Sequence, residues 1–345
     1  MNREARFWKK IGDKKIQCNL CSHNCKIDVG MLGICRVRKN EDGKLYTLIY
    51  GSCSSMAADP IEKKPLYHFY PGTNVFSLGT VGCNFKCKHC QNSSISTAMS
   101  DYSNLMTIMP ERAIELARER ACQGIAWTYN EPTIWHEFSF DSAKLAKKTG
   151  LYTVYVSNGY ISEDPLREIS PFLDAINVDV KAFDDDFYKK VCKARLDPVL
   201  RTCELAIELG IHLEVTYLII PGYNDSVDEV RQFCRWVVDK LGISTPVHFS
   251  RFHPDYMMTD VPMTPIETML RMYDIAKETG IFYPYLGNVP QCEYENTICP
   301  SCGSICIERC GYSVTLNGIE EGKCAKCGTS IHIVNGGRKN DLHFN

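Results

Sequence analysis

Hydrophobic residues along the middle of the chain follow two alternating patterns. Short runs rich in β-branched, aliphatic and aromatic residues are typical of buried strands, and each is followed by a longer segment with the apolar spacing of an amphipathic helix. The runs that predict strands cover 75–78, 125–129, 152–156, 175–180, 212–219 and 247–252, with a similar run at 282–286. The segments that predict helices lie near 110–122, 134–149, 163–170, 196–209, 226–241 and 265–279.

Start and stop signals support the predicted helices. Pro110 and Ser226 stand where helices should begin, and Gly150 and Gly280 stand where helices should end. Repeated β–α units of this length imply parallel strands joined by right-handed crossovers. Six units predict the α/β class, with an open, partial (β/α)6 barrel over residues 70–290.

Polar or unusual residues follow each predicted strand. In β/α barrels the C-terminal strand ends carry the chemistry, because their loops converge on one mouth. Any one of these residues could belong to an ordinary turn, but six groups in phase with six strands indicate a site. They are Cys83 to Cys90, Asn130 with Glu131, Ser157 with Asn158, Asp179 with Lys181, the turn at 221–225, and His253.

Three cysteines after the first strand carry the clearest chemistry. Cys83, Cys87 and Cys90 have C-x3-C-x2-C spacing. Thiolate is the soft ligand that iron prefers in a cubane cluster, and three ligands leave one iron open to a small molecule. A cluster that only transfers electrons would be expected to have four ligands. The alternative is a zinc knuckle completed by His89 or by a distant cysteine, and the spacing favours the catalytic 4Fe–4S cluster.

Cysteines near both ends of the chain predict two further metal sites. Two C-terminal C-x2-C pairs match a zinc ribbon, in which four thiolates surround a structural zinc ion; a redox cluster that also uses Cys306 and Cys310 is the alternative. The N-terminal set, C-x2-C-x3-C-x9-C, fits either zinc or an auxiliary iron–sulfur cluster. The ligands are Cys299, Cys302, Cys324 and Cys327 at the C-terminal site and Cys18, Cys21, Cys25 and Cys35 at the N-terminal one.

These patterns divide the chain into a Cys-rich region at 1–69, the barrel at 70–290 and a zinc-ribbon-like region at 291–345. The first residues carry no export signal, and no apolar run is long enough to span a bilayer. Nineteen cysteines then predict a cytoplasmic protein that uses them for metal and cluster binding, not for disulfides. The single cysteines are expected to be packing residues: Cys122, Cys192, Cys203, Cys234 and Cys292.

Net charge gives little indication of an anionic partner. The whole chain has a formal charge of −2, so it offers no strong field for nucleic acid. Residues 1–64 differ, because thirteen Lys and Arg against seven Asp and Glu leave +6. That excess could steer an anionic partner such as RNA, although a solvated basic face is the simpler interpretation.

The motif residues resemble those of a known superfamily. The triad and the strand before it are similar to the signature of radical S-adenosylmethionine (radical SAM) enzymes, and the resemblance covers the barrel region. Within that superfamily, three strings resemble the activating enzymes of pyruvate formate-lyase: Ser157-Asn158-Gly159, Asp179-Val-Lys181 and 220–225. A narrower resemblance, nearly end to end, is to the radical SAM enzyme of the AmmeMemoRadiSam system. It rests on the strings at 18–25, 54–72, 82–92 and 299–303.

The resemblance implies two cofactors and assigns residues to them. The three triad cysteines would ligate a 4Fe–4S cluster whose fourth iron is chelated by the amine and carboxylate of SAM. Glu131 would accept hydrogen bonds from the methionine ammonium, with Tyr129 and Asn130 in place of the glycines of the family's Gly-Gly-Glu motif. The other implied contacts are Ser157 and Asn158 near the ribose or the carboxylate, Lys181 at the carboxylate, His253 as a hydrogen-bonding residue, and 219–222 against adenine. Asp179 would contact ribose or join Asn177 and Ser157 at a monovalent cation.

The implied activity is that of an oxidoreductase. An external one-electron reductant, of flavodoxin or ferredoxin type, reduces the cluster, and SAM is cleaved to methionine and a 5′-deoxyadenosyl radical that abstracts hydrogen from the substrate. The residues do not identify this substrate. The leading hypothesis is a protein that receives a glycyl radical or a side-chain modification. The alternatives are an RNA-modifying radical SAM enzyme and a non-enzymatic metal-holding or electron-transfer protein.

Overall fold

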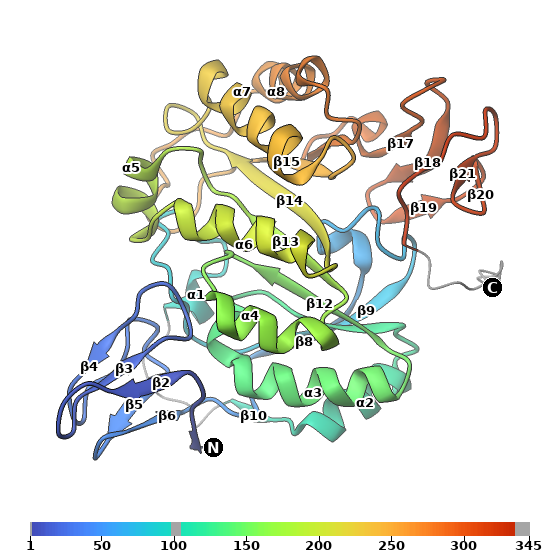
Figure 1. The fold of residues 1–345 in the computed structure, drawn as a ribbon. Coiled ribbons are helices and arrows are strands. Elements are labelled where there is room, and N and C mark those ends of the chain that lie inside the picture. The colour runs from blue at the N-terminus through green and yellow to red at the C-terminus, as the bar shows by residue number, and fades with distance from the viewer. Residues whose placement is uncertain (1, 98–104, 335–345) are drawn as a thin grey trace.

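The computed structural model describes residues 2–97 and 105–334 of the 345-residue chain. Its centre is one curved sheet of eight strands, in the order β16, β15, β14, β13, β12, β11, β9 and β8 (Figure 1). The first seven of these are parallel, and β8 runs antiparallel to β9. Their bounds are β8 Ser55–Pro60, β9 Asn74–Gly79, β11 Gly124–Trp127, β12 Tyr152–Ser157, β13 Ala175–Asp179, β14 His212–Ile219, β15 Val247–Arg251 and β16 Pro284–Gly287.

The predicted α/β class and partial barrel are confirmed. All seven runs that predict strands form strands of this sheet, because each carries enough apolar residues to be buried. The edge strand β8 was not expected, since its small residues Ser55, Ala57 and Ala58 give no strand signal. Strand β8 therefore belongs to the barrel sheet, although the sequence analysis assigns its residues to the Cys-rich region at 1–69.

Helices cover the outer face of the sheet and bury its larger core (Figure 1). The predicted helices are present, and Ser226 caps α7 by accepting a hydrogen bond from the backbone N–H of Glu229. Among the described residues, no helix has the length and apolar character needed to cross a bilayer. The longer helices are α2 Pro110–Glu119, α3 His136–Lys148, α4 Glu163–Ile169, α6 Asp197–Glu208, α7 Val227–Trp236 and α8 Ile266–Thr279. Shorter turns are α1 Ser93–Ser96, η2 Pro132–Trp135, α5 Asp185–Phe187, η4 Tyr188–Cys192 and η5 Val237–Leu241.

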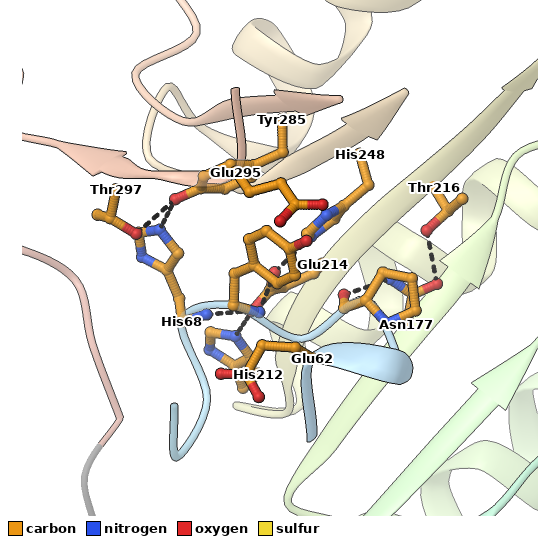
Figure 2. Close-up of polar contacts among 12 residues, drawn as sticks. Glu62, His68, Asn177, His212, Glu214, Thr216, His248, Tyr285, Glu295 and Thr297 are labelled. Carbon is orange, nitrogen blue, oxygen red and sulfur yellow. Dashed lines mark hydrogen bonds and ion pairs between the residues drawn. The ribbon is translucent and has the colours of Figure 1, made fainter. Parts of the chain in front are cut away.

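A floor segment, residues 61–72, closes the end of the barrel where the parallel strands begin. Its Ile61, Leu66 and Phe69 are buried against the interior side chains of β9, β11, β12 and β13. The carboxylate of Glu214, on β14, accepts hydrogen bonds from the backbone N–H groups of Tyr67 at 3.0 Å and His68 at 2.7 Å. The rings of His212 and His248 contact the same carboxylate at 3.0 and 2.6 Å, as Figure 2 shows.

The N-terminal region forms small sheets beside the barrel (Figure 1). Its Arg38 lies fully buried against Glu137 of α3, with 2.5 Å between the guanidinium and the carboxylate. This ion pair joins the region to the barrel. The strands are β1 Arg3–Glu4, β5 Arg38–Glu41 and β6 Lys44–Thr47 in one sheet, β2 Trp8–Lys10, β3 Ile16–Cys18 and β4 Lys26–Ile27 in a second, and β7 Ser52–Cys53 paired with β10 Met106–Thr107.

The C-terminal region packs on β16 and on the floor segment. One expectation is wrong here: Cys292 and Cys310 form a disulfide, so Cys292 is not a simple packing residue and Cys310 is not an additional metal ligand. The two meet because the turn η6 Cys292–Glu295 lies against β18, which brings their Cα atoms to 4.8 Å. The strands are β17 Thr297–Ile298, β18 Ile305–Cys310, β19 Ser313–Thr315, β20 Ile319–Glu320 and β21 Lys323–Cys324.

Candidate cluster and cofactor site

The three triad cysteines lie on the loop that follows β9, at the mouth of the barrel. Backbone hydrogen bonds fix this loop: Lys86 N–H donates to the carbonyl of Cys192 at 2.9 Å, and Lys88 N–H donates to that of Val191 at 3.2 Å. On the other side, Met257 N–H donates to the carbonyl of Lys88 at 3.0 Å. The loop is therefore held between η4 and the segment after β15.

The triad thiols lie close to one another in a largely buried setting. Burial raises the pKa of Cys83, and the neighbouring Glu131, Cys87 and Cys90 raise it further. The backbone N–H of Phe85 is directed at the Cys83 sulfur, 3.3 Å away. Three soft donors on one loop, with an amide already directed at a sulfur, fit an iron–sulfur cluster.

The zinc-knuckle alternative at the triad is not supported. In the described part of the chain, only the four C-terminal cysteines have donor atoms that all lie within 4.8 Å of one another. His89 is buried beside Phe187, at 6.1 Å between ring centroids, and neither of its ring nitrogens has a hydrogen-bond partner among the described residues. The triad and His89 therefore do not form the compact tetrahedron of a single zinc ion.

Glu131 is connected to the triad through Asn158. The Glu131 carboxylate is 1% exposed and accepts hydrogen bonds from Thr133 N–H at 2.9 Å, Ser157 O–H at 2.8 Å and Asn158 N–H at 2.8 Å. Burial raises the pKa of Glu131, and these hydrogen bonds oppose the rise. The side-chain amide of Asn158 lies 3.7 Å from the Cys83 sulfur. The loops after β11 and β12 thus meet at the cluster loop, as predicted.

Asn130 holds the start of the cluster loop. Its side-chain oxygen accepts a hydrogen bond from Thr80 N–H at 3.1 Å, and its amide donates to the carbonyl of Gly82 at 2.8 Å. Tyr129 before it has φ 70°, and Asn130 N–H bonds back to the carbonyl of Thr128, which makes a γ-turn of the rare, strained kind. The Tyr129 hydroxyl anchors this turn by donating to Asp59 at 2.7 Å.

Asp179 and Lys181 form an ion pair of 3.0 Å at the end of β13. The contacts of these residues do not support the alternative in which Asp179 joins Asn177 and Ser157 at a monovalent cation. Asn177 instead donates to the carbonyl of Pro65 at 2.8 Å and accepts from Thr216 at 3.0 Å, whereas Ser157 bonds to Glu131. Ser157 pairs with Val178 in the sheet, so its side chain points to the face opposite the one that Asn177 and Asp179 share.

The last two predicted strand ends also reach the site. His253, after β15, lies 3.2 Å from the side-chain amide of Gln91, which directly follows Cys90. In the turn after β14, the buried Asn224 holds the backbone: it donates to the carbonyls of Lys181 and Leu218, both at 2.7 Å. Ile219 and Ile220 before it are fully buried. The residues that end or follow all six predicted strands therefore meet around the triad.

Sequence reasoning missed Cys192, which it treated as a packing residue. Cys192 is fully buried at the end of η4, and its thiol is hydrogen-bonded to that of Cys87. This contact lowers the pKa of Cys87. Nothing in the sequence around Cys192 indicates the contact, because it depends on how η4 packs against the cluster loop.

The C-terminal cysteines form a second candidate metal centre. The sulfurs of Cys299 and Cys327 are 3.5 Å apart, and those of Cys302 and Cys324 are 3.7 Å apart. The two pairs are built alike, since Gly303 and Gly328 both have positive φ and their N–H groups bond to the carbonyls of Cys299 and Cys324. Tetrahedral zinc with metal–sulfur bonds of about 2.3 Å requires sulfurs roughly 3.8 Å apart, so this group can hold one such ion.

Comparisons with known proteins identify the family. The radical SAM superfamily model matches residues 77–237. An uncharacterized protein of Methanocaldococcus jannaschii is 48% identical over 334 residues, which is 96% of this chain and 99% of that protein. The chain belongs to the radical SAM superfamily. Membership in this superfamily implies a 4Fe–4S cluster and SAM as cofactors of the chain.

Two further relatives of this radical SAM protein are named as activating enzymes. The pyruvate formate-lyase-activating enzyme of Clostridium pasteurianum is 24% identical over 220 residues, 57% of this chain and 87% of that enzyme. The isethionate sulfite-lyase activating enzyme of Nitratidesulfovibrio vulgaris is 25% identical over 224 residues, 60% of this chain and 72% of that enzyme. The resemblance to pyruvate formate-lyase activating enzymes is thereby confirmed at the level of the family.

Proposed function

We propose that this radical SAM enzyme cleaves SAM reductively at the cluster held by Cys83, Cys87 and Cys90. Bound there, the 4Fe–4S cluster supplies one electron to SAM, which yields methionine and a 5′-deoxyadenosyl radical that abstracts hydrogen from the substrate. The observation that carries the proposal is the connected set Cys83, Asn158 and Glu131. It places a carboxylate acceptor beside the cluster ligands.

Glu131 is suited to receive the methionine ammonium of SAM. A carboxylate offers about four acceptor positions, and the N–H and O–H donors of the protein fill three of those on Glu131. The remaining position can accept a charge-assisted hydrogen bond from an ammonium group. In this proposal Ser157 and Asn158 orient Glu131, Asn130 orients the cluster loop, and Asp179, Lys181 and His253 contact the cofactor from the opposite strands.

The proposed substrate is a protein, and the proposed reductant is a carrier of flavodoxin or ferredoxin type. Relatives named as activating enzymes support a protein substrate. So does the barrel rim, where the loops after β14 and β15 expose large side chains that are frequent at protein interfaces. These are Tyr223, Tyr256, Met257 and Met263.

The RNA hypothesis is disfavoured by the way the basic N-terminal residues are used. Among the described residues, nine of the thirteen Lys and Arg at 1–64 are in ion pairs with Asp or Glu. Paired cations attract phosphate groups less strongly. We therefore expect no salt-sensitive RNA binding, and binding of a random RNA at low salt that weakens steeply with added salt would contradict this expectation.

At the C-terminal quartet we propose zinc, with a structural role. The compact spacing of the four sulfurs supports a single tetrahedral ion over a redox cluster. The narrower resemblance to the AmmeMemoRadiSam system and the location in the cytoplasm remain predictions from the sequence.

The proposal is tested by assaying SAM cleavage in protein purified and reconstituted without oxygen. Wild type reduced with dithionite should release 5′-deoxyadenosine, and Cys87→Ala should release none, because its cluster loses one of three protein ligands. Cys203→Ala, which changes a buried cysteine of α6, is the matched control and should keep the activity. Release of 5′-deoxyadenosine by Cys87→Ala at the wild-type rate would contradict the assignment of the triad.

A further inference from the structure

Three of the four N-terminal cysteines lie on one hairpin. Strands β3 and β4 pair antiparallel, with Ile16 opposite Ile27, and Cys18 N–H donates to the carbonyl of Cys25 at 2.9 Å. Cys21 lies in the connecting loop, which turns where Asn24 adopts φ 48° and its N–H bonds to the carbonyl of Cys21. The hairpin therefore gathers three thiols at its closed end.

Cys35 completes the set from the next loop. Gly33 lies between Cys35 and the hairpin. If Gly33 carried a methyl group, that group would be 3.4 Å from the side chain of Ile27, on β4, and 3.8 Å from the sulfur of Cys35. The Cys35 sulfur therefore faces the hairpin. Cys35 thus lies beside the hairpin that carries Cys18, Cys21 and Cys25, and the four cysteines form one group. We call this group the N-terminal quartet.

A buried cation lies beside the quartet. Arg38 is 1% exposed, and its backbone carbonyl accepts a hydrogen bond from Gly33 N–H at 2.9 Å, next to the Cys35 sulfur. Its guanidinium pairs with Glu137, but its Nε has no hydrogen-bond partner among the described residues. A buried donor without a partner is costly, and an anionic centre at the quartet would supply the missing acceptor or neutralise the charge.

The ligand set and the position of the quartet favour a cluster over a single ion. Among the described residues, the compact four-sulfur group that one zinc ion requires is present at the C-terminal site. The quartet instead lies beside the triad, where the 4Fe–4S cluster is proposed. Its four thiolates are also the full ligand set of a cluster that only transfers electrons.

The quartet lies directly against the cluster loop. Cys21 forms a β-bridge with Ile161, and the ring of His23 is 2.8 Å from the carbonyl oxygen of Asn84, next to Cys83. The backbone of Cys35 packs against Gly82, which directly precedes Cys83: a methyl group on Gly82 would be only 2.8 Å from the carbonyl oxygen of Cys35. Cys35 thus contacts the residue next to Cys83.

We propose that Cys18, Cys21, Cys25 and Cys35 hold a second 4Fe–4S cluster, which passes single electrons from a carrier protein to the cluster of the triad. In this step the carrier is oxidised by one electron, the quartet cluster is reduced and then reoxidised, and the triad cluster is reduced. No bond forms or breaks and no proton moves. The electron-transfer role rests on the proposed function, whereas the identity of the metal at the quartet does not.

Metal analysis of a triad-free variant tests the site itself. The variant Cys83→Ser/Cys87→Ser/Cys90→Ser leaves the quartet intact and is reconstituted with iron and sulfide without oxygen. We expect it to keep about four iron and about four sulfide ions per chain, with about one zinc from the C-terminal site. Its electron paramagnetic resonance signal after reduction should not change when SAM is added.

A triad-free protein that holds two zinc ions and no iron would overturn the proposal. The reciprocal variant, Cys21→Ser/Cys35→Ser, should lose about half of the iron and keep a signal that SAM changes. If wild type fails to cleave SAM while the triad-free variant retains iron, the proposed function is refuted. The proposal of a second cluster at the quartet is then still supported.

The electron-transfer role has its own test. Cys21→Ser/Cys35→Ser should cleave SAM at near the wild-type rate when dithionite is the reductant, because a small reductant can reach the triad directly. With reduced flavodoxin the same variant should be at least tenfold slower than wild type. Equal rates of variant and wild type with flavodoxin would overturn this role.

Discussion

At the scale of single residues, side chains distant in sequence prepare the cluster loop for its ligands. Asn130 bonds to both sides of the turn that leads into Cys83, and Asn158 links the Cys83 sulfur, through its side-chain amide, to the Glu131 carboxylate, through its backbone N–H. Fixing these groups before a cofactor binds lowers the cost of ordering them afterwards. The sequence marks both asparagines as site residues, but only the structure shows that Asn130 contacts the loop.

Cys192→Ala should alter the triad cluster without removing it. The Cys192 thiol is hydrogen-bonded to Cys87, and hydrogen bonds to cluster sulfur favour the reduced, more negative state. Losing a bond worth about 1 kcal/mol should lower the midpoint potential by up to roughly 40 mV. A redox titration followed by electron paramagnetic resonance measures this change.

Cys234→Ala provides the control, because Cys234 is equally buried in α7 but is not among the groups that act on the triad thiols. Its potential should equal that of wild type. Loss of iron from Cys192→Ala would instead show that Cys192 is itself a ligand.

At the scale of elements, the floor segment joins the barrel to the C-terminal region. Each carboxylate oxygen of Glu214 contacts one backbone N–H group of this segment and one histidine ring (Figure 2). His68 accepts a hydrogen bond from the Tyr285 hydroxyl at 2.6 Å and donates to the carbonyl of His332 at 2.9 Å. These contacts give Tyr67 and His68, in the 54–72 string, a structural role.

Glu214→Gln should destabilise the fold. Glutamine keeps the shape, but its NH2 group cannot accept the hydrogen bonds that the second carboxylate oxygen accepts, and the charge opposite His212 and His248 is lost. We expect the free energy of unfolding to fall by roughly 2–4 kcal/mol, measured by urea denaturation. Glu208→Gln, at an exposed pair on α6, should leave it nearly unchanged. Equal effects of the two substitutions would contradict the role of Glu214.

His68 should make stability depend on pH. Burial lowers its pKa from 6.5 to about 3, so the unfolded chain binds a proton between these values that the folded chain does not. Its contribution is therefore complete above pH 6.5 and is lost as the pH falls toward 3. Between pH 7.5 and 5 the free energy of unfolding should fall by about 2 kcal/mol from this residue.

The variant His68→Gln isolates that contribution. Urea denaturation at pH 7.5 and 5 should show a smaller loss on acidification in the variant than in wild type. An unchanged dependence on pH would show that other groups are responsible.

At the scale of the whole molecule, the regions at the two ends of the chain meet opposite ends of the barrel (Figure 1). The N-terminal region contacts the cluster loop through Cys35 and His23, whereas the C-terminal region contacts the floor segment. Arg309 makes the second contact specific, since its buried guanidinium donates to the carbonyl of Tyr67 at 2.6 Å. Changes at the C-terminal site should therefore affect stability more than cofactor cleavage.

Cys324→Ala should lower the melting temperature while some cleavage activity remains. Loss of one thiolate ligand removes the proposed zinc ion and its contribution to folding, and we expect a decrease of at least about 5 °C by calorimetry. Cys306→Ala, which changes a buried cysteine beside Cys324, should keep one zinc per chain and lose less stability. An unaltered melting temperature for Cys324→Ala would contradict a structural metal site.

The sequence by itself determined the features that depend on local pattern and spacing. Apolar runs gave the parallel strands, and cysteine spacing located the triad and both quartets. Only the tertiary structure decided which side chains meet: Cys192 with Cys87, Cys292 with Cys310, and Asn177 with Pro65 in place of Asp179. Such contacts join residues far apart in sequence, and their geometry depends on how whole elements pack, so no local pattern records them.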